Sequence, residues 1–505
     1  MRSRTITAIL SLILALATAA AIVYAKSGAA GSPTVRASNT ATLTVGSATL
    51  GRPIPPGFVG LTTEYTGLEA YAGANPAALD PVFEQLIRNL APSQSPILRI
   101  GGDSTDWTWF PIPHMTPPGG IRYSLTKTWL QVASQLAKTL DARLILGINF
   151  EADSARLAAA ETQGLLGGIG AGHISAFELG NEPELYRSFS WYKLPDGSHV
   201  RGRPPTYSYG NFIQDFSNVS RAVPRSTTLA GPSVGAPLWI PLLGQFLSGN
   251  RRLGLATLHR YPLKHCSPTA KVTIPEILSA ASSTGLAASV AGAVATSHAH
   301  GVPLRIDEMS AISCGGVQGV SHSFATGLWS LDALFAMARV GVDGVNIQTA
   351  PGSWNELFGV DQVKGAWRAA VYPAYYGLMM FAQAAPPGSS LLRVSGAPSP
   401  AVHVWATRGP DGTVRVVLIN DSTSGSRVIT IRNPTQSATA TLQRLQAPSA
   451  YATQGETLGG QSFGPETRTG LLAGTSGLTS LKPGATGYAI TLPAASAALL
   501  TLPPK

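Results

Sequence analysis

The chain has 505 residues, of which 44% are hydrophobic and 12% are charged. This length exceeds one ordinary core and this composition excludes a disordered chain, so we expect two folded domains and a targeting segment. The formal net charge of +10 suits an acidic partner. However, the sequence contains no run of five Lys or Arg and no nucleic-acid-binding motif, so we expect no nucleic-acid partner.

The N-terminal segment has the features of an export signal. Arg2 and Arg4 precede an uncharged apolar run over residues 6–24, and residues 23–25 resemble a signal peptidase site. We therefore expect residues 1–25 to be a signal peptide, with an uncleaved membrane anchor as the alternative. Residues 26–39 are rich in small polar residues and are expected to be a linker. In both cases the folded part lies outside the cytoplasm.

Between residues 57 and 384, short β-rich apolar runs alternate with helical stretches. This alternation implies parallel strands joined by right-handed crossovers, and eight units predict a (β/α)8 TIM barrel. A doubly wound open sheet is the alternative, but no Gly-rich phosphate loop follows the first strand. The expected strands are residues 58–65, 97–102, 143–150, 174–182, 228–233, 254–262, 303–310 and 344–350. The expected helices are residues 77–90, 126–140, 209–223, 274–300 and 324–339.

Residues 385–505 have a different pattern, with short β-branched segments bounded by Gly, Pro, Ser or Asn. The segments are residues 391–394, 401–407, 413–418, 427–431, 438–445 and 487–492. Helical periodicity is absent, so we predict an antiparallel β-sandwich domain that buttresses the barrel. Residues 40–56 precede the barrel and have the same character, and we expect them to add a strand to this sandwich.

Two predicted barrel strands end in a glutamate. Strand four ends at Glu182, and Glu308 lies near the end of strand seven; active sites of such barrels lie where strands end. Glycoside hydrolysis needs two carboxyl groups across the scissile bond, and a separation of about 5–5.5 Å gives retention of configuration. A solvated loop carboxylate is the alternative for either residue alone, but the pair favours a retaining glycosidase. Asp307 is expected to point to the opposite face and to be structural.

Several motifs resemble a known family of enzymes. Residues 177–183 resemble the acid/base strand of retaining (β/α)8 glycosidases, and residues 97–107, 258–263, 308–316 and 323–332 resemble glycoside hydrolase family 79. That family contains heparanases and β-glucuronidases. The resemblance spans the barrel from strand two to the helix after strand seven, and the β domain that follows is compatible with it. It implies that Glu182 is the acid/base and Glu308 the nucleophile.

The resemblance also implies the roles of residues around the sugar. Asn181 would bind the hydroxyl beside the anomeric centre, and Tyr261 would steer the nucleophile. Glu64 and Asp103 would contact hydroxyls at the far side of the ring. The backbone N–H groups of Gly315 and Gly316 would receive a uronate carboxylate, because backbone donors bind anions.

One departure from the family concerns the residues before this glycine pair. Family members carry a tyrosine there that helps to hold the carboxylate, whereas this chain has Ser313 and Cys314. Ser313 can donate a hydrogen bond but lacks the ring, which leaves uronate specificity open. Cys266 and Cys314 are the two cysteines of the chain, and we predict a disulfide between them at the rim of the pocket. Two unrelated thiols are the alternative.

Other residues complete the prediction. Trp354, after strand eight, is the best candidate to stack on a sugar, with rim packing as the alternative, and His259 is expected to orient its neighbours. The sequence shows no metal-ligand spacing, Ser–His–Asp arrangement or dinucleotide fingerprint, so we expect no metal and no cofactor. The first reading is an exo-acting β-glucuronidase-like hydrolase. The alternatives are a neutral β-glycosidase, an endo-acting enzyme on acidic polysaccharide, and a non-catalytic carbohydrate-binding surface protein.

Overall fold

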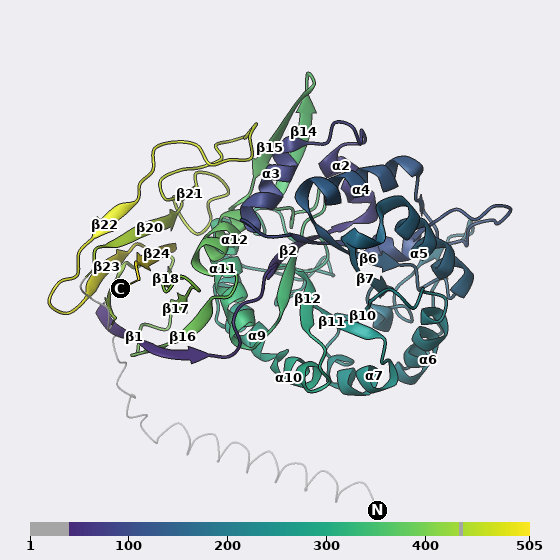
Figure 1. Cartoon of the computed structure of the whole chain (residues 1–505), viewed down its shortest axis with the longest axis horizontal. Coiled ribbons are helices and arrows are strands. Elements are labelled where there is room, and N and C mark those ends of the chain that lie inside the picture. The colour runs from purple at the N-terminus through teal and green to yellow at the C-terminus, as the bar shows by residue number, and fades with distance from the viewer. Residues whose placement is uncertain (1–39, 434–437, 505) are drawn as a thin grey trace, which may run out of the picture. The chain divides into compact units, whose positions relative to one another are not determined.

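The computed structural model describes residues 40–433 and 438–504, so the expected signal segment and linker, residues 1–39, lie outside the described residues. The predicted barrel is confirmed, because eight parallel strands close into a ring (Figure 1). In barrel order the strands are β2 (Val59–Glu64), β3 (Ile97–Gly101), β6 (Arg143–Ile148), β7 (Ile174–Leu179), β10 (Leu229–Val234), β11 (Leu253–Arg260), β12 (Leu304–Met309) and β13 (Gly344–Gln348).

Helices surround the ring, so the strands are buried on both faces and are mostly apolar. The helices are α2 (Leu68–Ala72), α3 (Pro81–Leu90), α4 (Lys127–Leu140), α5 (Ala155–Ile169), α6 (Tyr209–Ser220), α7 (Leu243–Gly249), α8 (Ile274–Ile277), α9 (Leu286–Ala288), α10 (Ala291–Ala299), α11 (Phe324–Arg339) and α12 (Pro373–Ala384). The helices α2, α5, α7 and α12 were not among those that the sequence predicted.

The predicted continuous helix over residues 274–300 is wrong. The segment is divided into α8, a π-helical turn at Ala281–Gly285, α9 and α10. Hydroxyl groups compete for backbone carbonyls here, because Ser282 Oγ donates to the carbonyl of Glu276 (2.6 Å) and Ser289 Oγ to that of Leu286 (2.6 Å). Such local bonds offer the backbone an alternative to a regular helix.

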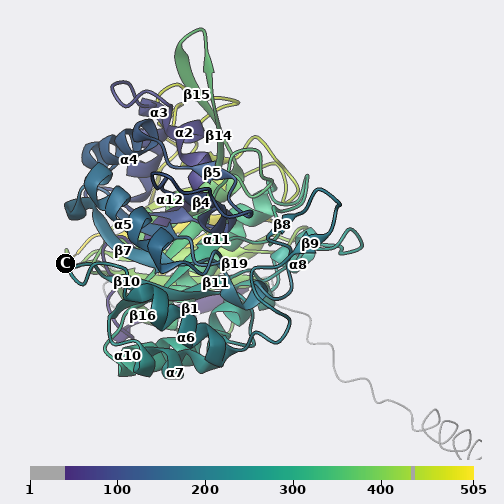
Figure 2. The same ribbon diagram turned by 90° about the vertical axis from the view of Figure 1, so that its right-hand side faces the viewer.

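Three small two-stranded sheets lie in loops that follow barrel strands. They are β4 (Thr108–Trp109) with β5 (Tyr123–Ser124), β8 (Tyr192–Lys193) with β9 (His199–Val200), and β14 (Phe358–Val363) with β15 (Ala366–Val371). The β14–β15 hairpin projects from the barrel (Figure 2). It lies in the loop between β13 and α12, so it belongs to the same end of the barrel as the other loops that follow strands.

The predicted C-terminal β domain is confirmed as an antiparallel-rich sheet of ten strands. Leu43, Ile490 and Leu500 come from separate strands of this sheet but belong to one apolar core, so the sheet curls around its own interior. The strands are β1 (Thr40–Leu50), β16 (Ser390–Ser395), β17 (Val402–Arg408), β18 (Val414–Asn420), β19 (Arg427–Arg432), β20 (Ala440–Gln446), β21 (Thr457–Leu458), β22 (Thr479–Leu481), β23 (Tyr488–Leu492) and β24 (Ser496–Leu502).

The first strand of this sheet comes from the N-terminal side of the barrel. β1 pairs antiparallel with β16 and parallel with β19. β24 was not predicted from the sequence because it is rich in Ala and Leu and contains a single β-branched residue, Thr501. It is nevertheless a central strand, paired with both β18 and β20.

Helices α11 and α12 lie between the barrel and the sheet (Figure 1). Asp332 of α11 accepts a hydrogen bond from Trp405 Nε1 (2.6 Å) and lies 2.6 Å from Nδ1 of His403, and both partners belong to β17. The ring of Phe335 stacks on that of Trp405 at 5.8 Å. This position between two domains explains why α11 is buried on nearly every side, whereas its sequence predicts one apolar face.

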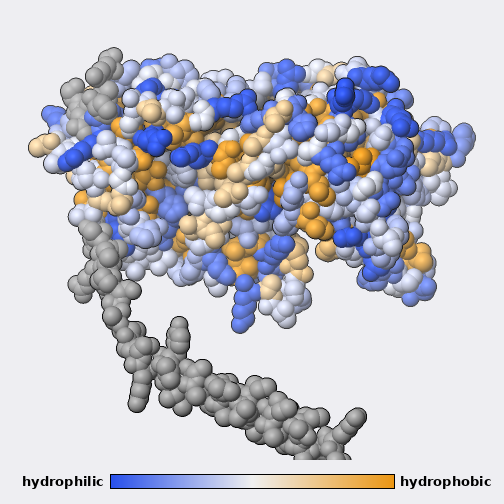
Figure 3. All heavy atoms as spheres, turned by 90° about the horizontal axis from the view of Figure 1, so that it is seen from below, coloured by the Kyte–Doolittle hydropathy of each residue, from blue (hydrophilic) through white to orange (hydrophobic). Residues whose placement is uncertain are grey.

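The surface has no dominant apolar region on the face seen in Figure 3, where hydrophobic and hydrophilic residues are interspersed. Among the residues that the structure describes, no helix combines the length and apolar character needed to cross a bilayer.

Candidate active site

The two glutamates predicted from the sequence meet at the mouth of the barrel. Glu182 lies three residues after the end of β7 in a left-handed backbone conformation (φ 48°), and Glu308 lies near the end of β12. Nδ1 of His259 is 3.1 Å from Oε1 of Glu182 and 3.9 Å from Oε1 of Glu308. The two carboxylates therefore approach the same ring nitrogen and lie close to each other at the mouth of the barrel.

Glu308 is surrounded by groups that stabilise its charge. Nη1 of Arg99 lies 2.7 Å from Oε2, and the hydroxyl of Tyr261 donates to Oε1 across 2.5 Å. Burial opposes ionisation, but His259, Arg99 and Tyr261 together hold the pKa of Glu308 below its ordinary value. An ionised carboxylate at neutral pH is what a nucleophile at this position requires.

Tyr261 remains a hydrogen-bond donor over the whole working pH range. Burial, followed by the charge of Glu308, raises its pKa well above the ordinary value. The sequence placed Tyr261 beside the nucleophile, and the structure puts it in direct contact with Glu308.

Arg99 is the centre of the charge network, and its side chain is fully buried on β3. Its Nε lies 2.7 Å from Glu178 Oε2 and 3.1 Å from Asp307 Oδ2. Its Nη2 donates to Oδ1 of Asn181 (3.0 Å) and lies 3.2 Å from Nε2 of His259. A single guanidinium thus joins the ends of several strands and orients both Asn181 and His259.

The position of Asp307 differs from the sequence prediction. We expected it to point away from the face of Glu308, yet both side chains contact Arg99. The pairing of β12 with its neighbours is irregular here: Leu258 pairs with Ile306, but the next residue, His259, pairs with Glu308. A bulge of this kind re-aims a side chain, and it turns Asp307 into the barrel.

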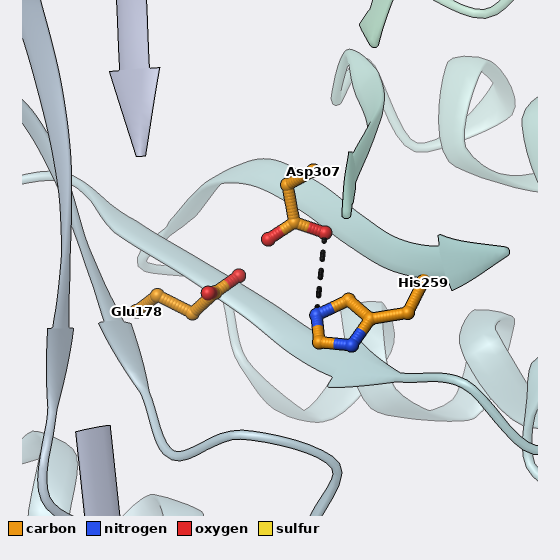
Figure 4. A group of neighbouring side chains, drawn as sticks. All are labelled: Glu178, His259 and Asp307. Carbon is orange, nitrogen blue, oxygen red and sulfur yellow. Dashed lines mark ion pairs between the residues drawn. The ribbon is translucent and has the colours of Figure 1, made fainter. Parts of the chain in front are cut away.

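Glu178, His259 and Asp307 face one another inside the barrel (Figure 4). Their ligand atoms lie within 4.8 Å of one another, so within residues 40–433 and 438–504 they are the group that could hold a metal ion. However, Arg99 already contacts all three side chains. The guanidinium supplies the positive charge between these residues, and a metal ion there would be repelled by it.

The acid/base candidate is oriented by His259. Burial opposes protonation of His259, but the charge of Glu308 and the bond to Glu182 help to raise its pKa to about 10. At neutral pH its Nδ1–H therefore donates to Oε1 of Glu182 across 3.1 Å. The neighbouring Glu184 accepts backbone N–H bonds from Gly235 and Ala236, both at 2.6 Å. These bonds tie the loop after β7 to the loop after β10 and fix the backbone on which Glu182 stands.

Asn181, Asp103 and Glu64 extend the site along neighbouring strand ends. Asn181 is 6% exposed, and its Nδ2 donates to Oδ1 of Asp103 (3.2 Å). Glu64 accepts a backbone bond from Ser104 (2.8 Å), and burial raises its pKa to about 6. Three predicted sugar-binding residues therefore lie close to the paired glutamates: Glu64 at the end of β2, and Asp103 and Asn181 just after β3 and β7.

The remaining predicted residues lie in the loops after β11, β12 and β13, where they form a second group at the rim of the barrel. Cys266 and Cys314 are joined by a disulfide, which links the loop after β11 to the loop after β12. Ser313 Oγ lies 3.4 Å from Sγ of Cys266, so its hydroxyl is directed at the disulfide. In residues 40–433 and 438–504, no hydrogen bond or ion pair connects this group directly to Glu182 or Glu308.

The glycine pair and Trp354 belong to this rim. Gly315 and Gly316 both have positive φ (82° and 80°), and a Cβ on Gly316 would lie 2.5 Å from Oδ1 of Asn355. The carbonyl of Gly315 accepts the backbone N–H of Trp354 (3.0 Å). The Trp354 side chain is 42% exposed, so its ring is available at the edge of the pocket.

The sequence analysis missed the roles of Arg99 and Glu178. A signal was available, because a lone charged residue in an apolar strand that is buried on both faces requires a partner. Arg99 lies in Ile97–Gly101 and Glu178 in Ile174–Leu179, and both strands are otherwise apolar.

Comparisons with known proteins agree with this architecture. Residues 404–499 match the glycosyl hydrolase family 79 C-terminal beta domain. A search of curated proteins gives no match. Among solved structures, a 4-O-alpha-L-rhamnosyl-beta-D-glucuronidase from Fusarium oxysporum 12S matches with a TM-score of 0.68 and 19% identity, over 91% of this chain and 100% of that chain.

Other solved structures share the fold at lower identity. A family GH51 arabinofuranosidase from Xanthomonas axonopodis pv. citri has a TM-score of 0.64 and 15% identity, over 92% of this chain and 99% of that chain. A family 44 xyloglucanase from Paenibacillus polymyxa has a TM-score of 0.61 and 11% identity, over 92% and 100%. The resemblance seen in the barrel motifs is thus joined by a match in the C-terminal domain: residues 404–499 are similar to the C-terminal beta domain of glycoside hydrolase family 79, and the chain shares its fold with the solved glucuronidase.

Proposed function

We propose that this protein is an exported, retaining glycoside hydrolase that cleaves β-linked uronic acid glycosides, with Glu182 as acid/base and Glu308 as nucleophile. The observation that carries the proposal is the meeting of these two carboxylates around His259, with Glu308 held by Arg99 and Tyr261. One carboxyl is placed to give a proton and the other to attack, which is the division of labour that a double displacement needs.

In the first step, Oε2 of Glu182 passes its proton to the oxygen of the leaving group, because Oε1 already accepts from His259. A carboxylate oxygen of Glu308 attacks the anomeric carbon, and the bond to the leaving oxygen breaks. The sugar is then esterified to Glu308. Asn181 contributes an amide N–H to the hydroxyl next to the anomeric carbon, a contact that strengthens in the transition state.

In the second step, Glu182 is ionised and acts as a base. It removes a proton from water as the water oxygen attacks the anomeric carbon, and the bond to Glu308 breaks. Two inversions give overall retention. Glycosylation of Glu308 removes one negative charge beside Glu182, which favours the ionised form of Glu182 in this step.

The proposed preference for a uronate depends on the Gly315–Gly316 turn at the rim of the barrel. Gly315 and Gly316 both have positive φ, and the N–H of Gly316 donates to the carbonyl of Ser313 (3.5 Å). The N–H of Gly315 is the backbone donor that we assign to the carboxylate, because backbone N–H groups bind anions. The solved structure from Fusarium oxysporum, a glucuronidase by its printed name, supports the same choice.

A second candidate keeps the mechanism but changes the substrate to a neutral β-glycoside, or to an internal bond of an acidic polysaccharide. Ser313 favours it, because its hydroxyl is directed at Cys266 rather than left for a carboxylate. The disulfide supports the proposed export, since such bonds persist outside the reducing cytoplasm.

A panel of aryl β-glycosides tests the proposal. We expect hydrolysis of the glucuronide well above that of the glucoside and xyloside, and proton NMR of the first product should show the β-anomer. The reverse order of rates would favour the second candidate. An α-anomer formed first would contradict the retaining mechanism, and binding of glycans without any product would contradict the enzymatic role.

A further inference from the structure

We propose that Glu178 and Asp307 share one proton, carried by Asp307, so that the pair acts on Arg99 as a single negative charge. The pair is thereby a positioning device for the guanidinium that holds Glu308. The functional part of this inference rests on the proposed role of Glu308, whereas the sharing of the proton does not.

Two carboxyl groups lie within hydrogen-bonding distance of the same N–H group, at Nε of Arg99. Both side chains are fully buried, and Oε2 of Glu178 and Oδ2 of Asp307 lie 2.7 and 3.1 Å from the same Nε of Arg99. One N–H cannot satisfy two carboxylates. Like charges this close in the interior of a protein repel strongly, and the usual outcome is that one of the two groups keeps its proton.

The hydrogen-bond partners identify which group is protonated. Glu178 has the shorter contact to Arg99 and a further bond from the hydroxyl of Thr257. Within the described part of the chain, neither oxygen of Asp307 accepts a hydrogen bond, and Oε1 of Glu178 also lacks a donor. A proton on Asp307 supplies the missing hydrogen bond of both residues, because Asp307 can then donate to Glu178.

The pKa directions agree with this assignment. Burial raises the pKa of both carboxyls, but Arg99 and the bonds from Asp307 and Thr257 bring that of Glu178 down to about 2. The pKa of Asp307 stays well above its ordinary value, through burial and the neighbouring charge of Glu178.

The charge balance around Arg99 relates the shared proton to the charge on Glu308. The guanidinium faces Glu178 and Asp307 through Nε and Glu308 through Nη1. If Asp307 were ionised, three buried carboxylates would face two cations, Arg99 and His259, whose Nε2 lies 3.7 Å from Oδ1 of Asp307. The excess negative charge would raise the energy of the charge on Glu308. With a shared proton, the pair anchors Nε and leaves Nη1 to Glu308.

Infrared difference spectroscopy of the full-length protein at pH 7 tests the shared proton. We expect Asp307→Asn to remove one carbonyl stretch of a protonated carboxyl group. We expect Glu178→Gln to remove the same band, because Asp307 must then ionise to remain the counter-ion of Arg99. No loss of such a band in Asp307→Asn would overturn the proposal, as would persistence of the band in Glu178→Gln.

Glu161→Gln is a matched control for the band assignment. Glu161 is another fully buried carboxyl, its pKa is raised well above the ordinary value by burial, and it accepts a bond from the backbone of Asn149. This variant should remove a band of its own and leave the Asp307 band in place. Loss of the Asp307 band in Glu161→Gln would assign that band to another group and would overturn the proposal.

Activity assays test the positioning role. In Asp307→Asn the acidic limb of the pH profile of kcat/KM on the preferred aryl glycoside should stay in place, because the amide is uncharged, as the protonated carboxyl is, and can still donate to Glu178. The double variant Glu178→Gln/Asp307→Asn removes the counter-ion of Nε and should lower kcat at least about tenfold with little change in KM. A shift of the acidic limb to lower pH in Asp307→Asn would show that Asp307 is ionised in the native enzyme.

Failure of this inference and of the proposed function can be told apart. If no glycoside is hydrolysed, the function fails while the infrared result still decides where the proton lies. If glycosides are hydrolysed but the band does not respond to Asp307→Asn, only the inference fails.

Discussion

The hydroxyl of Tyr261 donates to Oε1 of Glu308 across 2.5 Å, from the residue just after β11 to the neighbouring strand β12. This bond stabilises the charged form of the carboxylate and also fixes the direction from which its oxygens approach a substrate. Together with Arg99, it favours the ionised form of Glu308, the proposed nucleophile, whereas the hydrogen bond to Glu182 comes from the His259 ring.

Tyr261→Phe should lower kcat by about 10- to 100-fold, since one donor to a buried charge is lost. Removal of a group that lowers the pKa of Glu308 raises that pKa, so the acidic limb of kcat/KM should move to higher pH. The pH profiles of the two enzymes measure this shift. An unchanged limb would show that Tyr261 does not act on the charge of Glu308.

Glu182→Gln should depend strongly on the leaving group. With an alkyl or sugar leaving group, loss of the general acid should cost about 10²–10⁴-fold in kcat/KM, whereas a dinitrophenyl leaving group needs no proton and should lose far less. Glu184→Gln is the matched control, because its Oε1 can still accept from Gly235 and Ala236. Equal losses for both leaving groups in Glu182→Gln would reject the acid/base role.

The disulfide should stabilise both the fold and the rim. Cys266 and Cys314 are separated by 48 positions, and replacement of both by serine should lower the free energy of unfolding by about 2–4 kcal/mol. Because the bond adjoins the Gly315–Gly316 turn, KM for a glucuronide should rise more than KM for a glucoside. Denaturant titrations and the two KM values give the test, and an equal rise for both sugars would argue against a carboxylate site at this turn.

The contact between the two domains should depend on pH. Burial opposes protonation of His403, but the bond and charge of Asp332, with the charge of Asp421, raise its pKa to about 9. A raised pKa in the folded state adds stability that is complete below the unfolded value of about 6.5 and is lost as the pH rises through 9.

His403→Gln should therefore cost about 1–3 kcal/mol of stability at pH 6 and much less at pH 10. Urea unfolding at the two pH values measures the difference. A cost that is the same at both values would mean that the His403 charge contributes nothing to the contact between β17 and α11.

The barrel could be predicted from the sequence because every strand is a short apolar run that ends beside a helical stretch. Glu182 and Glu308 could be placed for the same reason, since each closes a predicted strand. The rule that successive strand residues point to opposite faces fails where the backbone departs from regular pairing. Asp307 is the clearest case, because the irregular register next to His259 is set by tertiary contacts.

The charge network was less accessible to sequence reasoning. Arg99 lies in a motif that signals the family resemblance, but its partners Glu178, Asp307 and Asn181 come from strands far along the chain. Only closure of the barrel brings them together. The orientation of Ser313 likewise depends on Cys266, a contact across two loops that no local pattern encodes.

The most direct test of the account is to trap the sugar on the enzyme. An activated 2-deoxy-2-fluoro derivative of the preferred glycoside slows the second step, so that the glycosyl-enzyme accumulates and can be digested for peptide mass spectrometry. We predict one label, on the peptide that contains Glu308 and on that side chain. A label on Glu182 or any other carboxylate, or turnover by inversion with no label, would contradict the assignment.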